Sequence, residues 1–295
     1  MKTALQVTAV IPTFNCRERV EGAIRSTLVQ DPLPIEVIVV DDGSTDGTDG
    51  KHLAAIDPRV KYIRLEKNHG GGAARNAGVD AASGNWLAFL DADDRWVPQK
   101  LSKQMAMLDK CRDSLIFGCA NVQFDGGPKD GKVCNRRPPG KDEDISRYFL
   151  IHLCTFQTST LIVPTQLARS VRFNNTLKRH QDWDFVLRLI RAGAAIGYSH
   201  EPLALYWDME DPNRISKQGS VEPTIYWISN AGNLIAPEAA TALYFRACFL
   251  QHLVNDPMKA IKTGCHLISR NPTAITWLTK KASQRIFKKF THPAR

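Results

Sequence analysis

Apolar residues alternate between two patterns in the first third of the chain. Short, mainly apolar runs at residues 7–11, 35–40 and 86–90 have the length and bulk of buried β-strands. Between the first two runs, apolar residues recur at the spacing of one helix face over about residues 17–30, namely Val20, Ala23, Ile24, Thr27 and Leu28. This alternation predicts strands joined by helices, and therefore a parallel sheet with helices on both faces.

The rest of the pattern predicts the organisation of the chain. Further strands are expected near residues 60–65 and 115–122, and a helix near 98–110. After Pro237 the pattern is helical, over about 238–254, 257–269 and once more beyond Pro272. We therefore predict an α/β fold with a doubly wound, mostly parallel sheet in residues 1–220, and a C-terminal helical region in residues 221–295.

Carboxylates follow two of the predicted strands. Asp41 and Asp42 end one apolar run, and Asp91 and Asp93 end another. Ligands of open α/β sheets bind beyond the carboxyl ends of the strands, and Asp91 and Asp93 share one side of an extended chain. Such oxygen ligands suit Mg²⁺ or Mn²⁺. The alternative is a turn at the end of a strand, because Asp is common in turns.

Two further segments add candidate chemistry. Residues 68–82 contain three consecutive glycines before a helix that holds Arg75, which is typical of a backbone that approaches an anion. They do not form a dinucleotide fingerprint, because Arg75 occupies the place of the third glycine. Asp182 lies at or near the start of a later helix, where it is either a cap or a general base. The alternative for the glycine segment is a flexible loop before a core helix.

Charge and cysteine content exclude several classes of protein. The chain of 295 residues has a net charge of +9, and the nine Lys and Arg residues after Asp256 supply all of it. A basic nucleic-acid groove through the body is therefore not expected. The seven cysteines are scattered and form no C-x-x-C pair, which argues against zinc and disulfides and favours a reducing cytosol. The basic tail is either an amphipathic membrane-surface helix or a helix docked on its own body.

Four segments, in this order, resemble a glycosyltransferase of family 2 with the GT-A fold: VIPTFN, VIVVDDGSTDGT, NHGGGAARNAGVDAASGNWLAFLDADD and RHQDWDFVLRL. The resemblance covers about residues 7–205. It implies an inverting transfer from a nucleotide-sugar, usually a UDP-sugar, assisted by Mg²⁺ or Mn²⁺.

The resemblance also implies roles for single residues. In the donor site, Pro12, Phe14 and Asp42 would line the base and ribose pocket, and Arg75 would lie near the nucleotide. Asp41 would support the turn beside that pocket. In the D-x-D segment, Asp93 would bind the metal directly, and Asp91 would contact the ribose or the metal.

The remaining roles concern the reaction itself. Asp182 would be the catalytic base, in a segment where the family often has Glu-Asp and this chain has Gln181-Asp182. Asp184 is a second candidate, expected to point elsewhere. Arg214 could close over the diphosphate.

The expected acceptor is a glycan or a polyprenyl-diphosphate-linked glycan, and no nucleic acid is expected as a partner. The tail would bind an anionic membrane surface, so the expected location is cytoplasmic and peripheral, on the cytoplasmic face of the inner membrane. Two alternatives remain: a nucleotidyltransferase, and a non-catalytic nucleotide-sugar-binding subunit. Release of pyrophosphate would indicate the first, and binding without turnover the second.

Overall fold

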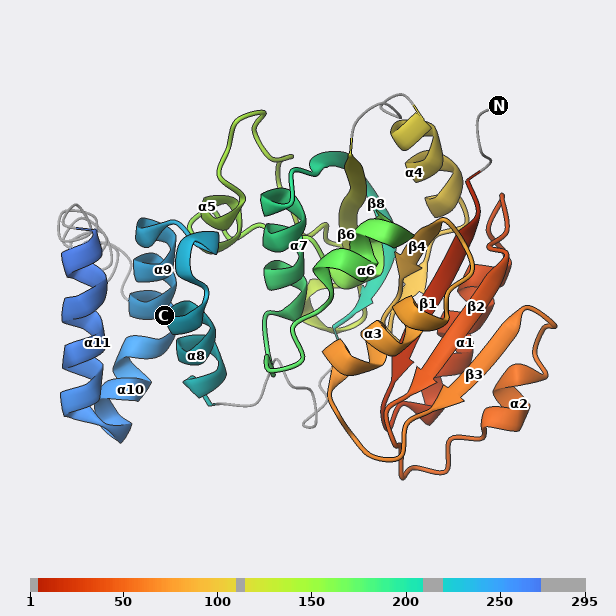
Figure 1. The fold of residues 1–295 in the computed structure, drawn as a ribbon, viewed down its shortest axis with the longest axis horizontal. Coiled ribbons are helices and arrows are strands. Elements are labelled where there is room, and N and C mark those ends of the chain that lie inside the picture. The colour runs from red at the N-terminus through yellow and green to blue at the C-terminus, as the bar shows by residue number, and fades with distance from the viewer. Residues whose placement is uncertain (1–4, 110–114, 209–219, 272–295) are drawn as a thin grey trace. The chain divides into compact units, whose positions relative to one another are not determined.

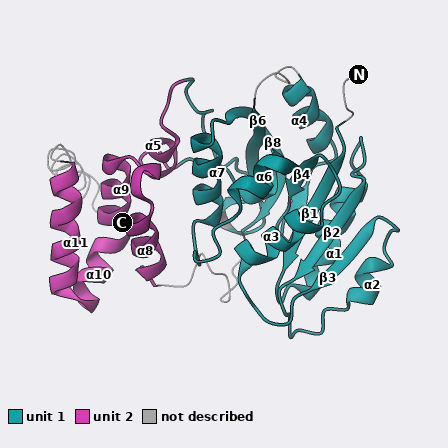
Figure 2. Cartoon of the chain, in the orientation of Figure 1, with its two compact units in different colours: residues 1–141, 154–218 teal, residues 142–153, 219–295 magenta. Residues whose placement is uncertain are grey.

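The computed structural model describes residues 5–109, 115–208 and 220–271, and the chain divides into two units. Unit 1 comprises residues 1–141 and 154–218, and unit 2 comprises residues 142–153 and 219–295 (Figure 2). The sequence prediction divided the chain after residue 220 and included residues 142–153 in the first domain. The structure places that short segment in unit 2 instead.

Unit 1 contains a sheet of eight strands in the order β3-β2-β1-β4-β7-β6-β8-β5 (Figure 1). Strands β1 to β4 pair in parallel, β7 is antiparallel to both β4 and β6, and β6 and β8 are parallel. The predicted α/β class with a helix-flanked sheet is confirmed, and the sheet is mixed because of β7 and β5. The strands are β1 (Val7–Thr13), β2 (Glu36–Asp41), β3 (Val60–Arg64), β4 (Trp86–Phe89), β5 (Arg95–Trp96), β6 (Ile116–Asp125), β7 (Ile162–Pro164) and β8 (Ala195–Trp207).

Helices cover both faces of this sheet. Ala9 and Ile11 of β1 belong to the same buried cluster as Ala23 of α1. Val10 points the other way, toward α3, where a Cβ on Gly78 would lie 2.3 Å from its Cγ1. The glycine therefore allows α3 to approach the sheet closely. The helices of unit 1 are α1 (Arg17–Leu28), α2 (Gly50–Ala54), α3 (Gly71–Ala81), α4 (Lys100–Asp109), α6 (Thr165–Val171) and α7 (Gln181–Arg191).

The carboxyl ends of three parallel strands meet at one edge of the sheet. In the register of β1 and β2, Thr13 lies opposite Asp41, and in that of β1 and β4, Val10 lies opposite Phe89. The loops that leave β1, β2 and β4 therefore start side by side. Residues of these three loops, far apart in the sequence, can build a single site.

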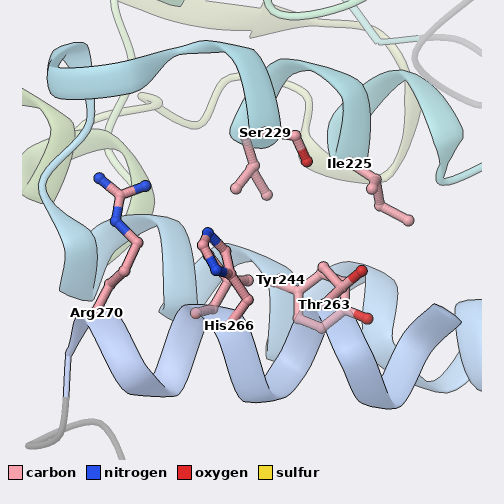
Figure 3. Close-up of a pocket in the computed structure, with 8 residues that line it drawn as sticks. Ile225, Ser229, Tyr244, Thr263, His266 and Arg270 are labelled. Atoms are coloured by element: carbon pink, nitrogen blue, oxygen red, sulfur yellow. The ribbon is translucent and has the colours of Figure 1, made fainter. Parts of the chain in front are cut away.

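Unit 2 is helical. The predicted helix over 238–254 is present, but its middle, Tyr244–Cys248, has π-helix geometry. A small cleft within this unit is lined by residues of α8, α11 and the π-helix, including Ser229, His266 and Arg270 (Figure 3). The predicted helix beyond Pro272 lies outside the described residues. The helices of unit 2 are α5 (Ile145–Leu150), α8 (Glu222–Asn230), α9 (Pro237–Leu243), α10 (Phe249–Asn255) and α11 (Pro257–Arg270).

Two further findings concern the described residues as a whole. No helix among them has both the length and the apolar content needed to cross a bilayer. The six cysteines within them are free thiols: Cys16, Cys119, Cys134, Cys154, Cys248 and Cys265.

Candidate active site

Side-chain bonds join the loops that follow β1 and β2. Asn15 has a left-handed backbone, with φ of 48°, and its Oδ1 accepts a hydrogen bond of 2.7 Å from the Thr45 amide. The Asn15 amide donates in return to Ser44 Oγ at 2.9 Å. The Arg17 amide, at the start of α1, donates to Asp46 Oδ2 at 2.8 Å. The polar residues of the segment GSTD thus hold the two strand ends together as one rim.

The adjacent carboxylates Asp41 and Asp42 serve different loops. Asp41 is buried, accepts from the Ser44 amide at 2.8 Å, and forms an ion pair of 2.6 Å with Arg64. These are the contacts expected of a residue that supports the turn. Asp42 accepts at both oxygens from the next loop, from the amides of His69 at 2.8 Å and Gly70 at 2.7 Å. Asp42 therefore fixes the glycine-rich segment just before α3.

Of the other two residues predicted for the nucleotide pocket, one is buried and one is exposed. Pro12 is buried within β1, opposite Val40 of β2. Phe14 follows the end of β1, and 45% of its surface is accessible. An exposed aromatic ring beside a fixed polar rim is available for stacking on a planar ligand.

Arg75 connects three segments of the site. It lies in α3, its side chain is largely buried, and its Nη2 pairs with Asp91 Oδ1 at 2.6 Å. Its Nη1 donates to Gln181 Oε1 at 3.0 Å, at the first residue of α7. The guanidinium also lies 5.4 Å from the ring centre of Phe173. One side chain thus joins the D-x-D segment to the helix that holds Asp182.

The D-x-D segment concentrates negative charge. Asp91 and Asp93 are half-buried, while Asp94 is buried and accepts from Ser159 Oγ at 2.5 Å and from the Trp207 amide at 3.0 Å. Burial raises the pKa of the Asp94 carboxyl well above its usual range, and the charges of Asp93 and Asp91 raise it further. Three carboxyl groups therefore lie close enough to repel one another.

The donor set at this position fits a hard divalent cation. Asp91 and Asp93 offer only oxygen ligands, and the repulsion felt by Asp94 is one that a cation would relieve. In the described part of the chain, no three His, Cys, Asp or Glu residues are grouped as a complete metal cage. Mg²⁺ is commonly held by one or two carboxylates together with the phosphates of a substrate, so a pair of carboxylates suits it.

Asp182 is the second residue of α7 and does not cap the helix, because His180 occupies the cap position. Its Oδ1 accepts from the neighbouring amide of Trp183 at 2.9 Å. Burial raises the pKa of the Asp182 carboxyl from 3.8 to about 6, against lesser lowering effects of the Trp183 amide and the Arg75 guanidinium. A carboxylate with a pKa near neutrality is suited to accept a proton from a substrate hydroxyl.

The two remaining candidates have different outcomes. Asp184 is buried and its Oδ2 pairs with Arg188 one turn later, at 2.7 Å, which confirms that it points elsewhere. Arg214 lies outside the described residues, and its role stays a prediction.

Sequence reasoning missed two features beside Asp182. His180 has a left-handed backbone, with φ of 62°, and its ring stacks on Trp183 with ring centres 4.9 Å apart and an interplanar angle of 18°. Trp183 Nε1 donates to Thr155 Oγ1 at 2.8 Å. The second feature is the bond between Arg75 and Gln181. The only available signal was the high aromatic and charged content of the segment RHQDWD.

Comparison with known proteins finds similarity to glycosyltransferases. The model of the family "Glycosyl transferase family 2" matches residues 8–163. The amylovoran biosynthesis glycosyltransferase AmsB of Erwinia amylovora is 29% identical over 76% of this chain and 77% of its own length. The Escherichia coli UDP-Glc:alpha-D-GlcNAc-diphosphoundecaprenol beta-1,3-glucosyltransferase WfgD is 37% identical over 38% of this chain and 44% of its own.

A likeness to solved structures is found as well. The crystal structure of S. aureus TarS 1–349 in complex with UDP covers 90% of this chain and 81% of its own, with a TM-score of 0.68 and 19% sequence identity. At this identity the likeness concerns the fold.

Proposed function

The chain belongs to glycosyl transferase family 2, and on this basis we propose that it moves a sugar, with inversion, from a nucleotide-sugar to a hydroxyl of a lipid-linked glycan. The name of WfgD describes a UDP-glucose donor and a diphosphoundecaprenol-linked acceptor, and TarS has been crystallised with UDP. These relatives support a UDP-sugar donor and an acceptor of that class here.

The observation that carries the proposal is the double contact of Arg75. By bonding Asp91 and Gln181 at once, it brings the carboxylates of the donor site next to the helix that begins with Gln181 and Asp182. Displacement at an anomeric carbon needs this proximity, because a base must act on one side of the carbon while the diphosphate leaves on the other.

Asp182 is the proposed base. Its ionised carboxylate accepts the proton of the acceptor hydroxyl, and the oxygen forms a bond to the anomeric carbon. The bond from that carbon to the diphosphate oxygen breaks, the electron pair leaves with the nucleoside diphosphate, and the configuration inverts. Asp91 and Asp93 would hold Mg²⁺ or Mn²⁺, whose charge stabilises the departing diphosphate.

The other residues bind and orient the donor. Phe14 and Pro12 line the proposed base and ribose pocket, and Asp42 contributes to it while fixing the loop before α3. Arg75 lies near the nucleotide and keeps Asp91 in place. Arg214, beyond the described residues, is proposed to close over the diphosphate.

The proposed location is the cytoplasmic face of the inner membrane. The support is charge: every charged residue after Asp256 is Lys or Arg, and each is worth about 1 kcal/mol near an anionic surface. The tail, residues 272–295, would supply most of that attraction. Changing Lys280, Lys281 and Lys288 to Gln should reduce co-flotation with anionic vesicles, and equal flotation would contradict this role.

The function is tested with the purified full chain and a panel of nucleotide-sugars in the presence of Mg²⁺ or Mn²⁺. Transfer predicts release of a nucleoside diphosphate and a product of inverted anomeric configuration, seen by NMR. Release of pyrophosphate would indicate a nucleotidyltransferase instead. Binding of a donor by calorimetry, without turnover on any acceptor, would indicate a non-catalytic subunit.

A further inference from the structure

Helix α11 carries different residues on three of its sides. Ala260, Gly264 and Leu267 recur three or four positions apart and are buried within unit 2. With 3.6 residues per turn, such positions fall on one side of a helix. By the same spacing, Met258 and Ile261 fall on another side. The third side is basic and consists of Lys259, Lys262, His266 and Arg270.

Large apolar side chains are exposed on the neighbouring helix α10 as well. Four large apolar side chains within twelve residues are exposed, and we call them the α10–α11 face: Leu250 at 73%, Val254 at 82%, Met258 at 78% and Ile261 at 51%. Leu250 and Val254 are one turn apart on α10, and the two helices are in contact. Isolated exposed apolar residues are ordinary, but a group of this kind marks a surface that binds something.

The charges beside the face indicate what it binds. Lys259 and Lys262 are exposed in the first half of α11, on the side of the helix next to that of Met258 and Ile261, and α11 contains no acidic residue. His266 and Arg270 extend toward the cleft below α8 instead (Figure 3). A second copy of the chain would oppose the same lysines to each other in a symmetric contact. An anionic partner with an apolar layer beneath its charges matches both features, and this is the chemistry of a lipid bilayer.

We propose that the α10–α11 face docks on an anionic lipid surface. The four apolar side chains enter the boundary between headgroups and acyl chains, and Lys259 and Lys262 extend to the anionic headgroups. The proposal deepens the proposed function and rests on it in one respect, since a lipid-linked acceptor would be presented at such a surface. The membrane contact proposed here is made by α10 and α11, and it is separate from the one proposed for the tail, residues 272–295.

Flotation of the full-length protein with vesicles tests this. Wild type and a variant with Val254→Glu and Met258→Glu are mixed with vesicles of phosphatidylglycerol and phosphatidylcholine, or of phosphatidylcholine alone. Two negative charges in the face should lower the partition coefficient on anionic vesicles by at least about tenfold. Because both side chains are highly exposed, the melting temperature should not change.

A matched control uses exposed apolar residues of unit 1. Val29→Glu with Leu33→Glu adds the same charges at side chains that are 62% and 48% exposed, and should leave vesicle binding unchanged. Lys259→Gln with Lys262→Gln should reduce the preference for anionic over neutral vesicles.

Two results would overturn the proposal. One is vesicle binding by the face variant equal to that of wild type. The other is a wild-type dimer that this variant converts to a monomer in sedimentation, because the face would then bind a second copy. Donor hydrolysis, measured without vesicles, reports on the proposed function separately. It should be the same in wild type and variant, and its absence in both would refute the function while leaving the docking result intact.

Discussion

The first turn of α7 contains two aspartates, Asp182 and Asp184, whose surroundings differ. Asp184 is buried and neutralised by Arg188 at 2.7 Å, so its charge serves the packing of the helix. Asp182 accepts from a neutral backbone amide, and burial raises its pKa to about 6. A buried carboxylate that is paired with a guanidinium stays ionised and does not take up protons readily. A carboxylate that is desolvated without such a pair has a raised pKa and takes up a proton more readily. The difference separates a structural acid from a proposed base.

Asp182→Asn should have the largest effect. The amide cannot accept the proton of the acceptor hydroxyl, so kcat should fall by roughly 10²- to 10⁴-fold. The Kd of the donor, measured by calorimetry, should change little. The pKa of Asp182 is raised on folding, so ionisation of its carboxyl lowers the free energy of unfolding. This loss begins above about pH 4 and is complete above about pH 6. At pH 7 the Asn variant should therefore be at least as stable as wild type.

Asp184→Asn is the control that sharpens this comparison. It leaves Arg188 without its partner carboxylate and should lower the free energy of unfolding by about 2 kcal/mol. Turnover per folded molecule should remain near that of wild type. Urea unfolding and kcat of both variants decide the matter, and an equal loss of turnover in the two would remove the distinction between the acids.

Arg75→Ala should have the next largest effect. The ion pair with Asp91 is mostly buried, so its loss should cost about 3 kcal/mol of unfolding free energy. Arg172→Ala is the control, because it removes an exposed ion pair with Asp80. It should lower the free energy of unfolding by less than about 1 kcal/mol. Turnover should also fall in Arg75→Ala alone, because the donor and base segments lose their connection. Similar unfolding curves for the two variants would contradict this account.

The pH dependence of kcat/KM gives a smaller effect in the unmodified protein. Asp182 must be ionised to act, and its raised pKa implies that kcat/KM falls below about pH 6, approaching tenfold for each further pH unit. The Arg75 guanidinium lowers that pKa, so its removal should move the acidic limb to higher pH. A limb centred near pH 4 would show that the base is an ordinary exposed carboxylate.

Gln181→Glu should have the smallest effect. The carboxylate would pair with Arg75 in place of the neutral amide oxygen, and it would add a negative charge next to Asp182. The acidic limb should rise by less than about one pH unit, with little change in the maximal rate. Gln181→Met, which removes the acceptor, should lower the rate more. A larger loss in the Glu variant than in the Met variant would contradict the bonding role of residue 181.

Local sequence pattern predicted the strands that consist mainly of buried apolar residues. The mainly apolar runs that became β1, β2 and β4 were recognisable because they are buried on both faces. Asp184 was expected to point away from Asp182 because residues two positions apart do not face each other on a helix, and it pairs with Arg188. In contrast, β7 has three residues, Ile162–Pro164, and exists through its pairing with β4 and β6. No periodicity can be read in so short a segment.

The site was predicted as a set of residue types, but its connections were not. Arg75 and Gln181 are 106 positions apart, and nothing in the spacing of either segment indicates that they bond. Asp42 was expected at a nucleotide, while its contacts with the amides of His69 and Gly70 depend on a left-handed glycine at position 70. Such contacts depend on the tertiary structure. The pKa of Asp182 depends on burial in the same way, so it could not be predicted from the sequence.

The excursion of residues 142–153 into unit 2 constrains how this protein can be recombined. Helix α5 packs on α9, and its residues Tyr148 and Phe149 are almost fully buried. In a chimera with a single junction near residue 220, α5 would come from one parent and α9 from the other, so α5 would lose the helix against which it packs. A cassette that transplants the helical part must therefore carry two splice points, and libraries built with one crossover should yield mostly insoluble proteins.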